Sequence, residues 1–184
     1  YKRQTPNFSP KPSGLPRIPV AMSAVGPAML RVAGQVADGV LLHPFSTRRY
    51  LAEESLARIG EGLERNSRKR HEIDVVSGAF IATGKDDEAV ARMKEYIRFR
   101  ISFYCSTRAY WNVLRLHGLE ELGEKLRPFP AAGRWSEMAA QIPDDIVELF
   151  AVVGRHDELA SKIAQKYEGP VSYTHLTLPT SRSV

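Results

Sequence analysis

Several features that define whole classes of protein are missing from this chain of 184 residues. It has one cysteine, Cys105, which excludes an internal disulfide framework and a cysteine-based zinc site. No apolar run reaches the roughly 20 residues needed to span a bilayer, and no secretory signal peptide opens the sequence. No metal-ligand spacing and no phosphate-loop or Gly-x-Ser-x-Gly motif occurs. These absences predict a cytoplasmic protein with no membrane partner and no metal.

Positive charge is in excess, with a formal net charge of +5, but it is not arranged to bind nucleic acid. The dense basic cluster, residues 65–70, falls at the end of a predicted helix, where cations suit the helix dipole. No aromatic residues are interleaved with it to stack on bases. We therefore expect a solvated helix end and no nucleic-acid partner, although a non-catalytic binding module that presents this cluster remains an alternative.

The stretch from Arg17 to Phe45 is the most informative part of the chain. Its apolar run Ile18–Met22 predicts a buried strand, and residues 40–42 predict a second one. Between them a helix is expected to begin at Gly26 and Pro27, which suit the N-cap and the first helical position. The face expected to be buried comprises Met29, Val32, Ala33 and Val36.

The turn before this helix is a candidate anion site. In a strand–helix–strand unit the backbone N–H groups at the helix N-terminus point at the turn, and this geometry accepts a phosphate. A plain Gly-Pro helix start, with no ligand, is the alternative reading of the same residues.

The pattern after Phe45 alternates between helix and strand. Ser46 or Thr47 is expected to cap a helix that runs to about Arg65, and residues 73–82 read as one strand in which Gly78 marks a bulge or a close backbone approach. The inner stripe of that first helix is predicted to be Tyr50, Leu51, Leu56, Ile59 and Leu63. A long helix should then start at Asp86 or Asp87 and run to about Tyr104.

Shorter helices are expected beyond this point. Ser106 or Thr107 can cap a helix over 109–116 that ends at Gly118. The other expected pieces are a helix over 119–126, breaks at Pro128, Pro130 and Gly133, a helix from Pro143 to Phe150 with Asp144 and Asp145 as capping residues, a turn at 152–154, and a helix over 157–167. This alternation predicts an α/β fold in which crossover helices connect parallel strands.

Three regions follow from this pattern. Residues 1–16, rich in Pro, Lys and Ser, read as an irregular connecting segment, and residues 17–170 as the folded domain. Residues 171–184 lack a matching hydrophobic pattern and resemble sequencing-adapter sequence read through as protein. We expect this tail to be non-native, and a native strand to have been lost at its start.

The ordered set of segments resembles the luciferase-like monooxygenase superfamily, and within it the oxidoreductases that depend on coenzyme F420. The supporting segments are residues 21–33, 37–45, 103–107, 116–118, 133–138 and 150–154. Members of that superfamily are TIM barrels of about twice this length. The resemblance therefore implies that this chain is the C-terminal half of a (β/α)8 barrel with a helical insertion, and that it is an incomplete, inactive fragment.

The resemblance also implies a cofactor and its site. The cofactor would be coenzyme F420, a deazaflavin, with FMN as the alternative, and its phosphate would lie on the turn after the first strand. The positions that match this turn are Ser23, Ala24, Val25, Gly26 and Pro27. His43 and Pro44, at the end of the next strand, match positions that border the cofactor. No catalytic residue can be carried over, because the half of the barrel that supplies most proton-transfer residues is not in this sequence.

Two further candidates have ordinary explanations as well. Phe103 and Tyr104 would line the substrate side, but their spacing also suits the buried face of any helix. His117, before Gly118, is expected to be a partly charged ring at a helix C-terminus. Cys105 is expected to act as a small apolar residue.

The function predicted from these readings is hydride transfer between bound deazaflavin and a small organic substrate. An FMN-dependent monooxygenase is the alternative within the enzyme class. The resemblance also implies a homodimer for the full-length protein.

Overall fold

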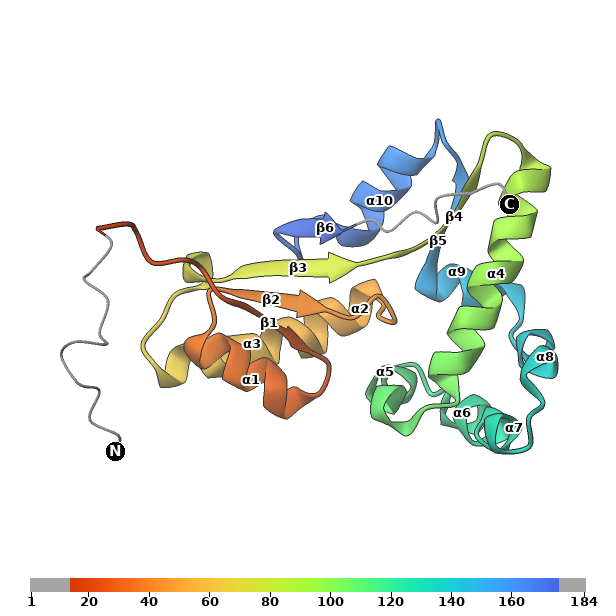
Figure 1. Ribbon diagram of the computed structural model, residues 1–184, viewed down its shortest axis with the longest axis horizontal. Coiled ribbons are helices and arrows are strands. Elements are labelled where there is room, and N and C mark those ends of the chain that lie inside the picture. The colour runs from red at the N-terminus through yellow and green to blue at the C-terminus, as the bar shows by residue number, and fades with distance from the viewer. Residues whose placement is uncertain (1–13, 176–184) are drawn as a thin grey trace, which may run out of the picture.

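The computed structural model describes residues 14–175, and its elements alternate between helix and strand as expected (Figure 1). The strands are β1 (Ala21–Ala24), β2 (Gly39–Leu42), β3 (Asp74–Gly78), β4 (Phe80–Gly84), β5 (Ala151–Arg155) and β6 (Tyr173–His175). The helices of the first half are α1 (Pro27–Val36), α2 (Arg48–Tyr50), a π-helical turn η2 (Leu51–Ser55), α3 (Leu56–Arg65) and the 3₁₀ turn η3 (Arg70–Glu72). Those of the second half are α4 (Asp87–Cys105), η4 (Arg108–Tyr110), α5 (Trp111–Leu116), α6 (Glu120–Leu126), α7 (Pro128–Ala131), α8 (Trp135–Met138), η5 (Ala139–Gln141), α9 (Asp144–Phe150) and α10 (Leu159–Tyr167).

The strands form two parallel sheets that share one stretch of chain. The larger sheet has the order β1-β2-β3-β6, and the smaller one pairs β4 with β5. Since β3 and β4 are separated by Ala79 alone, the chain passes directly from one sheet into the other. The single strand predicted over residues 73–82 is therefore wrong in extent. Both β3 and β4 have buried side chains, so the apolar pattern of the sequence continues across Ala79, where the chain changes the strand with which it pairs.

The smaller sheet overturns a second expectation. Residues 152–154 were predicted to form a turn, but they lie in β5, which pairs with β4 from Phe80↔Ala151 to Gly84↔Arg155. Lys162 and Lys166 of α10 bind backbone carbonyls along the edge of β5 that does not pair with β4. The Lys162 Nζ donates to the Val153 carbonyl at 3.0 Å, and the Lys166 Nζ donates to the Leu149 and Ala151 carbonyls at 3.0 and 3.1 Å. Two ammonium groups thus satisfy carbonyls that no neighbouring strand pairs within residues 14–175.

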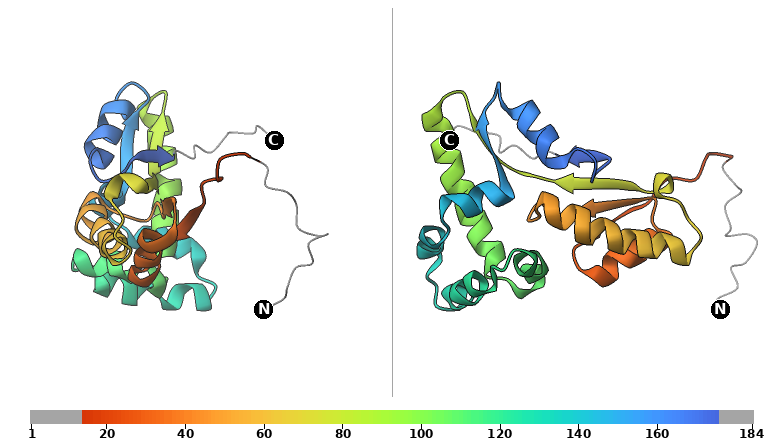
Figure 2. Two further views of the ribbon diagram at one scale, coloured as in Figure 1. Left: turned by 90° about the vertical axis from the view of Figure 1, so that its left-hand side faces the viewer. Right: turned by 180° about the vertical axis from the view of Figure 1, so that it is seen from behind.

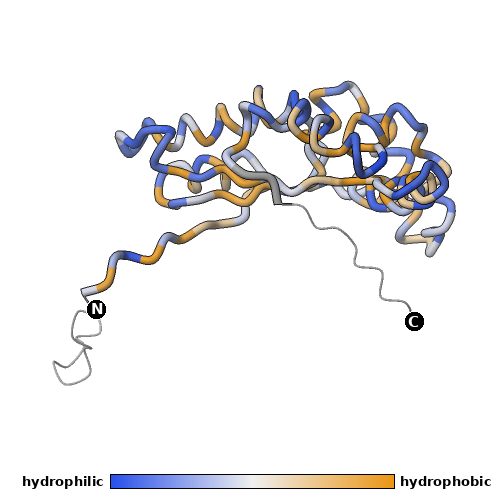
Figure 3. Tube along the Cα trace, turned by 90° about the horizontal axis from the view of Figure 1, so that it is seen from above, coloured by the Kyte–Doolittle hydropathy of each residue, from blue (hydrophilic) through white to orange (hydrophobic). Residues whose placement is uncertain are grey.

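The first strand starts later than the sequence predicted. Ile18 and Val20 are 81% and 60% exposed, and the chain that contains them extends away from the body of the molecule (Figure 3). Asp38 fixes this approach: its carboxylate pairs with Arg17 and accepts the Val20 N–H at 2.7 Å. Pro19 has no N–H to donate to a ladder, so regular pairing begins only at Ala21.

Helices α1 and α3 lie side by side against the larger sheet and pack through glycines (Figures 1 and 2). A Cβ at Gly34 would stand 2.2 Å from the Ile59 carbonyl oxygen, and one at Gly62 would stand 2.1 Å from the Arg31 carbonyl oxygen. This contact rotates α1 away from the predicted face. Its buried residues are Leu30, Ala33 and Gly34, whereas the predicted Met29, Val32 and Val36 are exposed.

The helix predicted over residues 47–65 is present with its cap. Thr47 accepts the Tyr50 N–H at 3.1 Å, while η2 interrupts the α-helix by one π-helical turn. The predicted inner stripe is confirmed, since Tyr50, Leu51, Ile59 and Leu63 are buried and Leu56 packs against the core.

The segment from α4 to α9 forms a helical insertion at the end of the strands, with its own core (Figures 1 and 2). Asp86 caps α4 by accepting the Ala89 N–H at 2.8 Å, as predicted. Ser106 and Thr107 are not caps, because their hydroxyls donate back to the Phe103 carbonyl at 2.7 and 3.2 Å. Helix α6 ends at Leu126, so the break predicted at Pro128 is present, but Pro128 then begins the short helix α7 and Pro130 lies within it.

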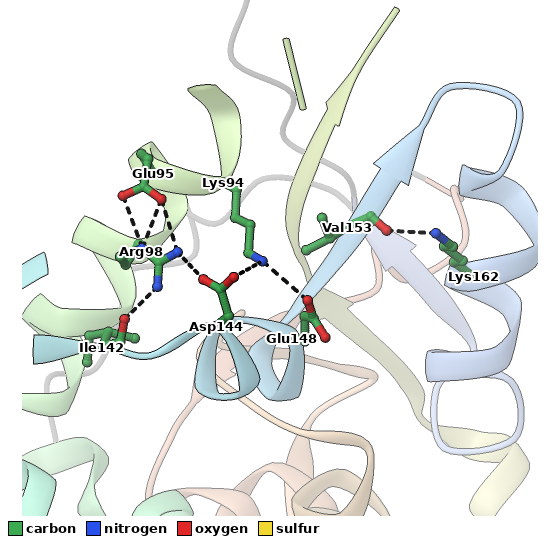
Figure 4. A network of polar contacts seen from close by, with 8 residues as sticks. All are labelled: Lys94, Glu95, Arg98, Ile142, Asp144, Glu148, Val153 and Lys162. Carbon is green, nitrogen blue, oxygen red and sulfur yellow. Dashed lines mark hydrogen bonds and ion pairs between the residues drawn. The ribbon is translucent and has the colours of Figure 1, made fainter. Parts of the chain in front are cut away.

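Asp144 has a different role from the predicted helix cap (Figure 4). Its carboxylate pairs with Lys94 at 3.0 Å and with Arg98, and Glu148 also contacts Lys94 at 3.2 Å. The hydrogen bond from Arg98 and that from Lys94 lower the pKa of Asp144. These charges join α4 to α9. Asp145, the other predicted cap, likewise lies in the first turn of a helix that has no side-chain cap bond.

The start of the tail is part of the sheet. Residues 173–175 form β6, parallel to β3 with Val76 opposite Tyr173, whereas the hydrophobic pattern predicts no element for this segment. The remainder of the tail and most of the predicted connecting segment lie outside the described residues. No helix within residues 14–175 is long and apolar enough to cross a membrane.

The glycine contact gives a first test. Gly62→Ala places a methyl group against the α1 backbone, so it should lower the free energy of unfolding by about 1–3 kcal/mol in a urea titration. Gly60→Ala is the matched control. No heavy atom of the described residues lies within 4 Å of the new Cβ, so it should raise stability by about 0.5–1 kcal/mol. Equal effects of the two substitutions would contradict the packing described here.

Candidate functional site

The turn between β1 and α1 is open, as the anion-site hypothesis requires. Gly26 is the N-cap of α1, in extended conformation, and Pro27 occupies the first turn. Ala24 is buried, whereas Ser23 and Pro27 are exposed. In the part of the chain that the structure describes, no heavy atom lies within 4 Å of a Cβ built on Gly26. Space for a ligand is therefore present beside the helix N-terminus.

His43 and Pro44 lie beside this turn, at the end of β2. A Cβ built on Gly78 would stand 3.1 Å from the Pro44 ring, which confirms the close approach predicted at Gly78. The His43 Nδ1 accepts the Phe45 N–H at 3.0 Å. In the neutral ring the proton must then be on Nε2, so His43 presents a hydrogen-bond donor.

Burial and the charge of Arg100 keep this ring neutral. Together they lower the pKa of His43 from 6.5 to about 4, and burial is the larger cause. The ring is enclosed by two tyrosines of the insertion. The ring centroids of Tyr104 and Tyr110 lie 4.6 and 4.7 Å from that of His43.

The two predicted substrate-side residues differ in position. Tyr104 contacts His43 directly and packs edge-on against Tyr110 with centroids 5.0 Å apart. Phe103 is 39% exposed; its ring contacts Tyr104 and stacks on Trp135 at 6.1 Å. The structure therefore brings Tyr104 to the candidate site, and Phe103 to its outer side.

A narrow cavity joins the ends of β1 and β2 to the insertion. Its lining residues are Ala24, Val25, Leu30, Leu42, His43, Phe45, Ser46, Tyr50, Ser55, Ala109, Tyr110, Asn112 and Val113. Ala24 and Val25 of the turn thus face one space with His43 and Tyr110, whereas Ser23, Gly26 and Pro27 do not line it.

Ser46 is the residue of this cavity that sequence reasoning missed. It is 5% exposed, and its Oγ has no hydrogen-bond partner among the described residues. Buried hydroxyls are nearly always bonded, so an unpaired one marks a place where a ligand or water binds. The signal in the sequence was the pair Ser46-Thr47: one hydroxyl suffices to cap the helix, and Thr47 does so.

His117 and Cys105 have structural roles. The His117 Nε2 lies 2.8 Å from the Thr47 Oγ1, and burial together with the Arg49 charge lowers the pKa of His117. His117 lies at the C-cap of α5, as predicted, but its surroundings disfavour the charged ring that was expected there. Cys105 is fully buried, and burial raises its pKa to about 12, as expected for an inert apolar residue.

A wider groove between α2 and α10 offers less chemistry. Its cations already have partners: Arg49 pairs with Glu53, Arg48 donates to the Gln165 carbonyl, and the two α10 lysines bind the β5 carbonyls of Val153 and Ala151. No group of acidic, cysteine or histidine residues suited to a metal ion occurs within the described part of the chain.

The neutral state of His43 is directly measurable. An NMR titration of its ring protons should give a midpoint of about 4. The unfolded chain then binds more protons than the folded one between that pH and 6.5, so stability should fall as the pH is lowered through this interval. His43→Asn should flatten this part of the stability profile. A midpoint at or above 6.5 would contradict the enclosure of the ring.

Comparison with known proteins agrees with this geometry. Residues 1–173 match the family described as luciferase-like monooxygenase. An uncharacterised protein of Mycobacterium tuberculosis is 39% identical over 171 residues, which cover 93% of this chain and 50% of that protein. The 5,10-methylenetetrahydromethanopterin reductase of Methanopyrus kandleri is 29% identical over 157 residues, which cover 84% of this chain and 43% of the reductase. The chain thus spans about half the length of these relatives.

Solved structures give the architecture. The coenzyme F420-dependent tetrahydromethanopterin reductase from Methanopyrus kandleri superposes with a TM-score of 0.67 at 26% identity, covering 86% of this chain and 44% of the reductase. An F420-dependent secondary alcohol dehydrogenase, 11% identical, shares the fold with a TM-score of 0.61 over 88% of this chain and 43% of that one. The fold is a partial TIM barrel, α/β with parallel strands, and no closed sheet forms among residues 14–175. On its sequence match and its architecture, this chain belongs to the luciferase-like monooxygenase family, close to its F420-dependent oxidoreductases.

Proposed function

We propose that this chain is the cofactor-binding half of an oxidoreductase that transfers hydride between coenzyme F420 and a small organic substrate. The observation that carries the proposal is the unpaired Ser46 hydroxyl, buried in the cavity that the β1–α1 turn and His43 also line. The methanopterin reductase of Methanopyrus kandleri, to which this chain is similar in sequence and in structure, depends on coenzyme F420, which supports this cofactor.

The residues present fit such a group. Ser23, Ala24, Val25 and Gly26 would hold its phosphate, because backbone N–H groups at a helix N-terminus stabilise an anion, and Pro27, which has no N–H, would border the phosphate at the helix start. His43 would donate from Nε2 to an oxygen of the cofactor. The Ser46 hydroxyl would form a hydrogen bond with a polar group of the cofactor. Pro44 would border it. The deazaflavin would supply the hydride-transfer chemistry when bound.

The insertion would shape the substrate side. Tyr104 and Tyr110 would exclude water from the space over His43, and Phe103 would extend that apolar wall outward toward Trp135. A dry site favours hydride transfer because it strengthens electrostatic contacts and excludes competing reactions with water.

The whole-protein properties are part of the same proposal. We infer a cytoplasmic protein that is a homodimer at full length, with residues 17–170 as the partial barrel and residues 171–184 as a tail of non-native sequence, of which residues 173–175 pair with β3. This chain alone should show little or no turnover, since β1 and β6 each have one neighbouring strand within residues 14–175.

A nucleic-acid-binding module is less well supported. The guanidinium of Arg68 donates to the Gly34, Ala37 and Glu72 carbonyls, and that of Arg70 donates to the Ile73 carbonyl. These contacts commit Arg68 and Arg70 of the basic cluster to joining helix to strand, while Arg65 and Lys69 stay exposed.

Cofactor binding to this chain tests the proposal. Titration with coenzyme F420, followed by cofactor fluorescence, should give saturable binding, and FMN titrated in parallel identifies the alternative cofactor. Gly26→Val should weaken binding at least about tenfold, because its side chain enters the space left for the phosphate, while the extended backbone accepts it. Gly60→Val, on the open side of α3, is the control. If neither cofactor binds, the proposal is wrong.

Ser46→Ala separates a ligand-binding hydroxyl from a structural one. Removing an unpaired buried hydroxyl should leave the free energy of unfolding unchanged or raise it by about 1 kcal/mol. Cofactor binding should weaken roughly fivefold at the same time, which corresponds to about 1 kcal/mol. Thr47→Ala is the contrasting variant, since it removes a helix cap and should lower stability by about 1 kcal/mol. A stability loss in Ser46→Ala with unchanged binding would overturn the role assigned to Ser46.

A further inference from the structure

Arg100 is a half-buried cation that aromatic groups surround. It lies on α4, one turn before Tyr104, and its Nη1 donates to the Tyr96 hydroxyl at 3.2 Å. Its guanidinium carbon lies 5.8 Å from the centre of the Phe80 ring and 5.9 Å from that of Tyr96. Hydrogen bonds with the phenols of Tyr96 and Tyr104 raise the pKa of Arg100. The group is therefore positioned by neutral neighbours and keeps its full charge.

The other cations of α4 differ from Arg100 because they form ion pairs with carboxylates. Arg92 pairs with Glu88, Lys94 with Asp144 and Glu148, and Arg98 with Glu95 and Asp144. Arg100 has no ion pair with any carboxylate of the described residues, so its charge is not neutralised within this part of the chain.

Packed aromatic rings link Arg100 to the His43 ring. Its guanidinium lies over Phe80, whose ring centroid is 5.9 Å from that of Tyr104, and Tyr104 packs edge-on against His43 at 4.6 Å. The Arg100 charge also contributes, after burial, to the lowered pKa of His43. Tyr110 is the other tyrosine ring against His43, and no Asp, Glu, Lys or Arg of the described residues lines the cavity beside it. An unpaired cation thus lies near a neutral hydrogen-bond donor.

We propose that Arg100 forms an anion subsite with the Tyr104 hydroxyl and the His43 Nε2–H, and that the substrate of this site carries a carboxylate or phosphate group. The inference rests on the proposed function, since it names the class of substrate for the same site. A guanidinium offers a planar pair of donors that matches either group, and a charge-assisted hydrogen bond of this kind is stronger than a neutral one. The rings of Phe80 and Tyr96 hold the Arg100 guanidinium in place, and neither ring competes with it for the anion.

Small anions provide the test, because they need neither a known substrate nor turnover. The ring protons of His43 are followed by NMR in this chain while inorganic phosphate or benzoate is added at constant ionic strength, with chloride as the balancing salt. An anion bound beside Arg100 offsets its charge, so the apparent pKa of His43 should rise with either probe. Whichever of phosphate and benzoate gives the larger rise identifies the anionic group that the subsite prefers.

Variants assign the effect to Arg100. Arg100→Met keeps the apolar stem over the rings and removes the charge; it should itself raise the pKa of His43 and weaken the anion response at least tenfold. Arg92→Met removes an exposed cation of the same helix and should leave the response unchanged. The inference fails if neither anion shifts His43, or if Arg100→Met responds like the unaltered chain.

Repeating the anion titration in the presence of coenzyme F420 distinguishes failure of this inference from failure of the proposed function. With saturating coenzyme F420 present, the anion response should persist, since the substrate and the cofactor use different subsites. If the anion and coenzyme F420 compete, Arg100 binds an anionic group of the cofactor, and its assignment to the substrate is wrong. Loss of F420 binding with the anion response retained would remove the proposed function and leave the anion subsite in place.

Discussion

The chain from β3 into β4 pairs with different strands in its two halves, and this sharing positions the rest of the molecule. The first half lies between β2 and β6, and the second half pairs with β5. Val75 of the first half lies in one hydrophobic core, whereas the second half contributes to both, with Ile81 in the core of Val75 and Phe80 and Ala82 in the other. Because one covalent strand enters both cores, the helical insertion is held at the end of the larger sheet, where the ends of β1 and β2 are open.

The candidate site lies at the junction of these two parts. The β1–α1 turn and His43 come from the larger sheet, whereas Tyr104, Tyr110 and Arg100 come from the insertion. Neither part alone would enclose the His43 ring. Its neutral state is therefore a property of the packing between the two, and the ionic contacts of α4 with Asp144 and Glu148 help to fix the helix that supplies half of the enclosure.

Local chemistry made some of these features predictable from the sequence. Gly26-Pro27 at a helix start, the Thr47 and Asp86 caps, and the stripe of α3 depend on residues a few positions apart. The buried face of α1 was not predictable in this way, because an apolar pattern gives no weight to Gly34, and the contact with Gly62 decides the rotation.

Other features could not be predicted for the same reason: they depend on contacts between segments that are far apart in the sequence. Residues 152–154 form a strand because β4 is there to pair with them, and nothing nearby in the sequence signals that partner. The unpaired state of Ser46 and the approach of Arg100 to His43 arise only when distant segments meet. The family resemblance supplied the turn and His43, but not these two residues.

The lysines of α10 have one more consequence. An uncovered strand edge is a template for association with another molecule, since its carbonyl and amide groups seek partners. Lys162 and Lys166 place their ammonium groups on the Val153, Leu149 and Ala151 carbonyls. A foreign strand approaching this side would have to displace both cations and bury them without their partners. The β5 edge of the small sheet is thereby protected from edge-to-edge association.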